Sequence, residues 1–546
     1  MKKSGSPGLV LVLLSVVALL GLTPFLKGAF YIGKHEGDTL HMAEIVLRMA
    51  DGQWPHLDFM TPIGMLAMAP IALFVAIGAT MGKAIFLAQL LVALLLLPVT
   101  VHVVQSRITP AAGRIVGWAF GAFVMVLCLA LVHGEAEPAI SISMHYNRWA
   151  WAVAYLMVPL VLLEPQGRAR PVLDGVLIGL AMAVLALTKA TYAVSLAPVM
   201  IVGLLARRWW RMMLWAVIGG LLVMGAVTLL AGPGIWPAYL GDLLTVARSD
   251  VRPQPGKSLE GVTTYPAYLA GTMTLFAVVM FLRQAGRLTE GLLLLILAPG
   301  LIYITYQNYG NDPQWMVLLA MLAAVLRPAD GVRNARGWDL RKALGMAALA
   351  ALAFGLPSVL NLSYSPLRLL GASTEKRVPL TRERPEMADI LTTGDRIYAV
   401  LQTRDGDGPG SPLAAYARYA DREKELASIN GEALPYCEMV SGTSAWSETV
   451  AADLTAAGYA GTHIVATDVF SNFWLFGDFP PVKGSAPWYY DDLSGFENAD
   501  YILVPLCAVS LRIRADVVRT LDERGITLTE VRRTPLYLLM SAKKAS

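Results

Sequence analysis

The stretch Pro62-Ile-Gly-Met-Leu-Ala-Met-Ala-Pro70-Ile-Ala-Leu-Phe-Val-Ala-Ile-Gly78-Ala-Thr80 decides the topology of this chain. It is apolar enough to resemble a membrane-spanning helix, but Pro62, Gly64, Pro70 and Gly78 interrupt it. Interruptions of this kind are typical of a segment that lies in the membrane interface or dips into it. We therefore expect residues 62–80 to form an interfacial helix and not a span.

The distribution of arginine supports leaving this segment out of the spans. Twelve apolar runs, residues 62–80 included, approach the ~20 residues that a membrane helix needs. If all twelve crossed, with Lys2 and Lys3 inside, five basic loops would violate the positive-inside rule. Omitting residues 62–80 moves all five loops to the cytoplasm, so we predict about eleven transmembrane helices plus interfacial helices. The loops hold Arg107 and Arg114; Arg168 and Arg170; Arg207, Arg208 and Arg211; Arg283 and Arg287; and Arg327, Arg333, Arg336, Arg341 and Lys342.

Charge density divides the chain into two domains. Residues 1–362 hold 25 basic and 16 acidic side chains, whereas the shorter segment of residues 363–546 holds 19 and 24. The first segment has the composition of an α-helical polytopic membrane domain. The second has an ordinary charge density and is long enough to bury its own core, so we expect a soluble domain there.

The C-terminal segment alternates between strand-like and helix-like patterns, which predicts an α/β domain. Its Cys437 and Cys507 could form a disulfide if the domain lies in an oxidising compartment. With the arginine-rich loops inside, this domain is periplasmic and the protein is a multi-pass protein of the bacterial inner membrane. We expect strands at residues 396–402, 463–467, 501–505 and 535–541, and helices at residues 411–426, 446–458 and 510–524.

Charged and imidazole groups gather just after the first apolar run, at one edge of the membrane. Residues 38–50 have the spacing of an amphipathic surface helix, and Asp38 at its start could simply cap the free amides. A cap needs only one such group, however, so the density of the cluster makes acid–base or metal chemistry plausible. The cluster consists of Lys34, His35, Glu36, Asp38 and His41.

This loop resembles the first periplasmic loop of the glycosyltransferase C superfamily. The matching residues are Gly37-Asp38-Thr39, His41, Ala43, Arg48, Gly52-Gln53-x-Pro55-x-x-Asp58-Phe59 and Pro62-x-Gly64. The likeness is greatest to bacterial members of the protein mannosyltransferase type, including the lipid A aminoarabinose transferases. The resemblance implies that Asp38 is the catalytic base or electrostatic centre, with Glu36 supplying the second acid because Thr39 stands where the family has glutamate.

The turn Leu187-Thr188-Lys189 is similar to the Leu-Thr-Lys-Gly turn of the same family. A lysine between adjacent spans is costly unless it reaches the interface or an anion; we expect Lys189 to bind a lipid phosphate, with snorkelling to headgroups as the alternative. The other basic residues expected at the donor phosphate are Lys83, Arg148, Arg248 and Arg252. Residues expected to bind the sugar or the acceptor are His41, Asp58, Glu137, His145, Tyr146 and Asn147.

These residues predict a membrane glycosyltransferase that moves a sugar from a polyprenyl-phosphate donor to an envelope glycan or glycolipid acceptor. Asp38 would act as general base, and a single displacement would invert the anomeric centre. A divalent cation held by Asp38 and Glu137 stays open, because some relatives use one. The alternatives are a transporter or flippase for a lipid-linked or amphipathic solute and a non-catalytic scaffold. Nothing in the sequence indicates nucleic-acid binding.

Overall fold

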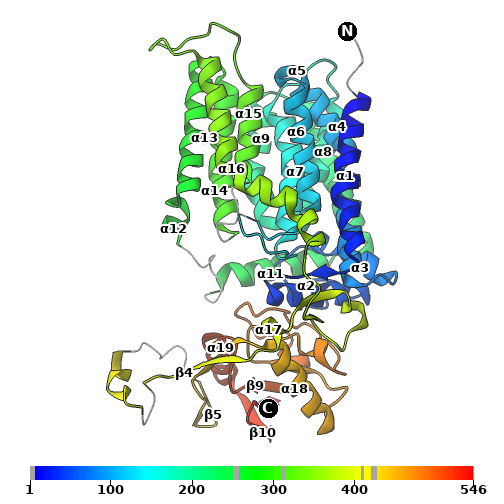
Figure 1. Ribbon diagram of the computed structural model, residues 1–546, viewed down its shortest axis with the longest axis vertical. Helices are drawn as coiled ribbons and strands as arrows, with labels where there is room; N and C mark the ends of the chain where they lie inside the picture. Colours follow the sequence, from blue (N-terminus) through cyan, green and yellow to red (C-terminus); the bar gives the residue numbers. More distant parts are fainter. Residues whose placement is uncertain are drawn as a thin grey trace.

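The computed structural model describes residues 6–134, 136–249, 258–308, 314–407, 411–419 and 427–544. A helical bundle forms one part of the molecule, and a C-terminal domain containing strands covers one end of it (Figure 1). The last helix of the bundle, α16 (Leu340–Leu370), continues past residue 362, where composition put the domain boundary. The first strand after it is β2 (Arg377–Pro379).

The bundle is that of a multi-pass membrane protein. Seven of the described helices are long and apolar enough to cross a membrane, and the shorter helices lie among them, so the predicted number of eleven spans stays a prediction. The seven contain α1 (Ser6–Lys27), α4 (Met81–Val103), α8 (Pro171–Thr188), α10 (Trp210–Ala231), α13 (Pro266–Gln284), α14 (Leu288–Tyr306) and α16. The shorter ones are α6 (Arg114–Leu129), α9 (Ala190–Ala206) and α15 (Trp315–Val325), and α7 (His145–Leu162) has 18 residues but is not among the seven.

Residues 62–80 do not form a span, as predicted. They contain a 3₁₀ turn (Met65–Ala67) followed by α3 (Ala69–Ala76), a helix of 8 residues. At 1.5 Å per residue, α3 is about 12 Å long, far short of the ~30 Å core of a bilayer. In consequence, the arginine-rich connections lie together at the end of the bundle away from the C-terminal domain (Figure 1).

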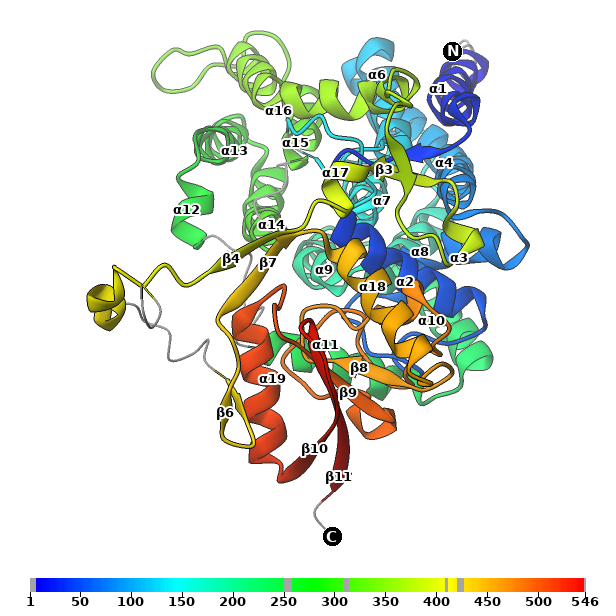
Figure 2. The same cartoon turned by 60° about the horizontal axis from the view of Figure 1, so that its bottom comes forward.

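Three helices lie between the bundle and the C-terminal domain (Figures 1 and 2). They are α2 (Glu36–Ala50), α3 and α11 (Ile235–Arg248). Helix α2 begins two residues before the predicted start at residue 38. This layer forms the surface on which the cavities described below are built.

The C-terminal domain is an α/β domain, as predicted. Its main sheet has the order β10-β11-β9-β8, in which only β8 and β9 are parallel. The sheet consists of β8 (Ile464–Ala466), β9 (Tyr501–Pro505), β10 (Ile526–Arg533) and β11 (Tyr537–Lys544), and the longer helices are α18 (Thr443–Ala456) and α19 (Leu511–Glu523). Smaller strands are β4 (Leu401–Arg404), β5 (Ser428–Ile429), β6 (Glu432–Ala433) and β7 (Cys437–Ser441). A disulfide joins Cys437 to Cys507.

Three predictions for this domain need correction. Strand β10 was not expected, because only its first half alternates apolar and polar residues and Glu530, Arg532 and Arg533 interrupt the pattern. Residues 396–402 are not one strand, since α17 (Gly394–Ile397) precedes β4. Of the helix expected over residues 411–426, the structure has a 3₁₀ helix (Ala414–Tyr419), and residues 420–426 lie outside the described part.

A small sheet joins the first loop of the bundle to the C-terminal domain. Strand β1 (Phe30–Tyr31) pairs in parallel with β3 (Ile390–Thr393), which pairs with β2 on its other side. The start of α4 is fixed to the same domain, because the Asp389 carboxylate accepts hydrogen bonds from the Thr80 hydroxyl at 2.6 Å and the Gly82 amide at 2.8 Å. The segment that carries α2 is therefore held at both of its ends by the C-terminal domain.

Candidate active site

A cavity of about 720 Å³ lies where α2, the loop before α7, the turn between α8 and α9, α11 and the C-terminal domain meet. Apolar side chains of residues 62–68 and of α11 form part of its wall, among them Ile63, Met68, Leu243 and Val246. Five of the residues singled out from the sequence line this cavity together: Asp38, His41, His145, Tyr146 and Lys189.

Asp38 does not cap its helix. Because α2 begins at Glu36, Asp38 is the third residue of the helix, within its first turn, and its Oδ2 atom accepts a hydrogen bond from the Ser143 hydroxyl at 2.6 Å. His133 Nδ1 lies 3.1 Å from the same hydroxyl. Burial lowers the pKa of His133 to about 3, so the imidazole is neutral. Since Ser143 gives its one hydrogen to Asp38, His133 donates to Ser143 through Nδ1–H.

Burial lowers the pKa of Lys189 to about 7, and the described residues leave its ammonium form without a counter-ion. Its Nζ atom donates to Asn147 Oδ1 at 3.3 Å and to Asn308 Oδ1, and it lies 5.6 Å from the centre of the Tyr146 ring. All of these partners are neutral, and no carboxylate among the described residues forms an ion pair with it. An ammonium group held in this way, on a cavity wall, attracts an anion.

A glycine brings residues 62–68 to the cavity beside Lys189. Gly64 donates its amide to the Thr188 carbonyl at 3.2 Å, at the end of α8. A Cβ atom on Gly64 would lie 2.1 Å from the Leu187 carbonyl oxygen, a distance that no side chain tolerates. The Pro62-x-Gly64 pattern therefore has a structural role, which is to let this segment close on the turn that carries Lys189.

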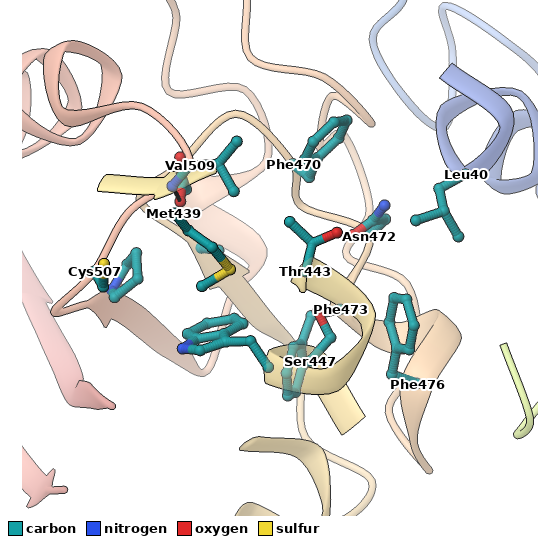
Figure 3. A pocket seen from close by; sticks show the side chains of 14 residues that line it. Leu40, Met439, Thr443, Ser447, Phe470, Asn472, Phe473, Phe476, Cys507 and Val509 are labelled. Carbon is teal, nitrogen blue, oxygen red and sulfur yellow. Dashed lines mark hydrogen bonds between the residues drawn. The ribbon is translucent and has the colours of Figure 1, made fainter. Parts of the chain in front are cut away.

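Side chains of the C-terminal domain fix the position of α2. A cavity of about 40 Å³ in that domain is bordered by Leu40 of α2, whose side chain points toward Phe470 and Asn472 in Figure 3. A Cβ atom on Gly37 would lie 2.9 Å from the tip of the Phe470 ring. At the far end of α2, the buried Arg48 donates to the Val482 carbonyl at 3.0 Å. The helix that carries Asp38 is thus packed on the domain along its length.

Glu36 lies outside this cavity and does not join Asp38 as a second acid. Its carboxylate is bound by the Arg396 guanidinium, with Oε2 and Nη2 2.9 Å apart, and it accepts a hydrogen bond from the Thr392 hydroxyl at 3.0 Å. Burial raises the pKa of Glu36, but the Arg396 hydrogen bond and charge outweigh burial and lower it overall. Glu36 therefore stays ionised and links α2 to the C-terminal domain.

Arg148, expected at the donor phosphate, is buried, does not line the cavity and binds backbone carbonyl groups. Its guanidinium donates to carbonyl oxygens of Ala130 at 3.2 Å, of His133 and Ser143 at 3.4 Å each, and of Val132. These bonds hold the loop that carries Ser143 against α7. The structure gives Arg148 the role of a clamp for this loop.

Asp58 and Glu137 also serve their own loops. Asp58 Oδ2 accepts a hydrogen bond from the Trp54 amide at 2.7 Å, and its carbonyl accepts one from the Gly484 amide at 2.7 Å. Glu137 forms an ion pair with Lys34 at 2.8 Å. Neither carboxylate lines the cavity, so Glu137 does not stand beside Asp38 as a metal ligand.

Two other basic residues named from the sequence, Lys83 and Arg248, do not line the cavity that contains Asp38. Lys83 is exposed at the start of α4 and does not line the cavity. Arg248 lines a different cavity, of about 330 Å³, together with Asp491 and Asp492. Arg252 lies outside the described residues.

The other two histidines of the cavity, His41 and His145, are positioned by neighbouring groups. The His41 ring meets the Trp488 ring edge-on, with centres 5.3 Å apart. His145 is buried, with Nε2 2.9 Å from the Ala67 carbonyl oxygen and Nδ1 3.2 Å from that of Ile142. Among the residues that the structure describes, no group of three His, Cys, Asp or Glu side chains is placed to hold a metal ion.

Sequence reasoning missed several residues of the cavity. Ser143 and His133 belong to a loop that was recognised as functional, but nothing in its sequence distinguishes a serine that binds Asp38, 105 positions away. The other missed residues come from the end of α14 and from the C-terminal domain, far along the chain, and no sequence signal links them to the first loop. They are Tyr303, Gln307, Trp488 and Tyr490.

No protein-family model matches this sequence, and no curated protein matches it. Two solved structures are similar to it over nearly the whole length. The crystal structure of ArnT from Cupriavidus metallidurans in the apo state is 13% identical and covers 98% of each chain, with a TM-score of 0.41. The crystal structure of the same protein bound to undecaprenyl phosphate is 14% identical and covers 98% of each chain, with a TM-score of 0.35.

Proposed function

We propose that this protein is a membrane glycosyltransferase that moves a sugar from a polyprenyl-phosphate donor to a hydroxyl group of an envelope glycan or lipid. One observation carries the proposal. A carboxylate and an ammonium group, Asp38 and Lys189, line one cavity and are held by neutral partners, next to an apolar wall. A base, a phosphate-binding group and an apolar surface are what this reaction needs.

In the proposed reaction, Asp38 accepts the proton of the acceptor hydroxyl as its oxygen attacks the anomeric carbon of the donor sugar. The bond from that carbon to the phosphate oxygen breaks, and its electron pair leaves with the phosphate. Lys189 stabilises the charge that develops there by a charge-assisted hydrogen bond. Because attack and departure occur on opposite faces of the carbon, the product has inverted configuration.

The same arrangement supports a path for the polyprenyl tail of the donor and a periplasmic position for the cavity. The apolar wall formed by α11 and residues 62–68 offers the polyprenyl chain a route from the bilayer to Lys189. The arginine-rich loops lie at the opposite end of the bundle, so the positive-inside rule favours a periplasmic cavity. The disulfide between Cys437 and Cys507 supports an oxidising compartment for the C-terminal domain.

Comparative mass spectrometry of envelope glycolipids and polyprenyl-phosphate sugars, in cells with and without the gene, tests this proposal. We expect the deletion strain to lose one sugar from an envelope product and to accumulate its lipid-linked donor. Complementation with the wild-type gene should reverse both changes, and complementation with Asp38→Asn should reverse neither. Restoration of the product by Asp38→Asn would falsify the assigned role of Asp38.

Transfer by the purified protein separates this function from transport. In detergent there are no two compartments, so a transporter or flippase makes no product from a lipid-linked sugar and a soluble acceptor analogue. A transferase does. We expect product formation in detergent by the wild-type chain.

A further inference from the structure

A second, polar cavity of about 320 Å³ lies next to the first. The same three segments contribute to both cavities: the loop before α3, helix α11 and the loop over residues 484–497 of the C-terminal domain. In each segment, residues one or two positions apart face different cavities. Met60, Asp242 and Asp492 line the second cavity, whereas Pro62, Leu243 and Tyr490 line the first.

The lining of the second cavity carries more negative than positive charge. Asp242, Asp492 and Glu497 supply carboxylates, Arg524 supplies a guanidinium group, and Ser494 adds a hydroxyl. Arg524 Nη2 lies 3.3 Å from Asp492 Oδ1, so this pair is partly neutralised, whereas Glu497 forms no ion pair with any described residue. The cavity therefore repels phosphate and carboxylate groups and favours uncharged or cationic ligands.

A buried histidine nitrogen on this cavity lacks a partner. His56 is only 8% exposed and lines the cavity, with Nδ1 2.8 Å from Asp242 Oδ2. The carboxylate accepts from Nδ1–H, and a second donor, the Thr61 amide at 3.1 Å, holds it in place. His56 Nε2 has no hydrogen-bond partner among the described residues; it would accept a hydrogen bond in the neutral ring and donate one in the protonated ring. Buried polar atoms in native proteins are nearly always satisfied, so a ligand hydroxyl or amine suits this position.

We propose that this second cavity binds a saccharide unit without acidic groups, with amine-bearing sugars bound more tightly than neutral ones. Vicinal hydroxyl groups match the alternating acceptors and donors of its carboxylates, imidazole and guanidinium. The inference rests on the proposed function, because the unit belongs to the acceptor whose reactive hydroxyl reaches Asp38. Since three segments are shared, an acceptor of at least two sugar units would occupy both cavities at once.

Saturation-transfer difference NMR on the detergent-purified full chain tests the site with glucosamine, glucose and glucuronate as probes. We expect the strongest saturation transfer to glucosamine, less to glucose and the least to glucuronate. The double variant Asp492→Asn/Glu497→Gln should lower the glucosamine signal about fivefold or more. Glu386→Gln, a change of the same kind at an exposed position that lines neither cavity, should leave the signal as in the wild type.

A single variant at Glu497 and two variants of the first cavity distinguish loss of this binding site from loss of the fold or of the transfer reaction. Glu497 is exposed, so Glu497→Gln alone leaves the fold intact and should still reduce the glucosamine signal. Asp38→Asn and Lys189→Met should abolish transfer yet keep glucosamine binding at the second cavity, which separates failure of this site from failure of the transferase. Equal signals for glucuronate and glucosamine, or an unchanged signal in both Glu497 variants, would overturn the proposal.

Discussion

Two sets of charged groups, near opposite ends of the helical bundle, are held in opposite ways. At the end away from the C-terminal domain, the buried Asp174 is bound by His102 Nε2 and Arg107 Nη2, each at 2.6 Å. At the other end, Asp38 is held by a hydroxyl and Lys189 by side-chain amides, and both face a cavity of about 720 Å³. The ion-paired charges at the first end hold helices together, and we call it the closed end. At the second end, which we call the open end, charged groups bound by neutral side chains beside a cavity are available to a ligand.

The largest effect is expected at the open end, from Asp38→Asn. The asparagine Oδ1 atom can still accept the Ser143 hydrogen bond, so the melting temperature should stay as in the wild type. Without a base, the transfer rate should fall by about 10²- to 10⁴-fold. Product formation from a polyprenyl-phosphate sugar measures this loss, and a rate within a factor of about ten of the wild type would remove Asp38 from the base role.

The same substitution at the closed end should have the opposite profile. Asp174→Asn leaves Arg107 buried beside a neutral amide, and breaking a buried ion pair typically costs about 3–5 kcal/mol. We therefore expect a clearly lower melting temperature and a lower yield of folded protein, with transfer per folded molecule nearly unchanged. If Asp174→Asn abolished transfer without loss of stability, the contrast between the two ends would break down.

Lys189→Met sharpens the contrast by removing the uncompensated cation. The affinity for polyprenyl phosphate should fall by about 10- to 100-fold, the value of a hydrogen bond to a charged group. Binding of the lipid phosphate to the purified protein measures this change. Lys483→Met, which removes an exposed lysine of the C-terminal domain, is the matched control and should bind as the wild type does.

From the sequence, the interfacial segment and two key residues of the open end could be predicted, but the contacts that its other charged residues make could not. Interruptions by Pro62 and Gly64 correctly excluded a span, and Asp38 and Lys189 do line one cavity. Charge alone could not tell which other residues face it. Arg148 was expected at the site because it is basic and lies on the outer side of the membrane, and Glu36 because Thr39 stands where the resembling family has a second acid. The structure binds both to partners that only the tertiary fold brings near.

The smallest effect is expected from Ser143→Ala, which leaves every charge in place. The substitution removes the 2.6 Å hydrogen bond to Asp38 Oδ2 and leaves His133 Nδ1–H without its acceptor. Asp38 keeps its carboxylate but loses the hydrogen bond that fixes its orientation. We therefore expect kcat to fall about tenfold, the value of one such hydrogen bond, and KM to stay unchanged. Ser143→Thr restores the hydroxyl and should recover most of the rate.

A serine that served only to pack the loop would give the reverse pattern, with Ser143→Ala harmless and the larger threonine damaging. The kcat of these two variants therefore distinguishes a residue that orients the base from one that merely supports the open end of the bundle.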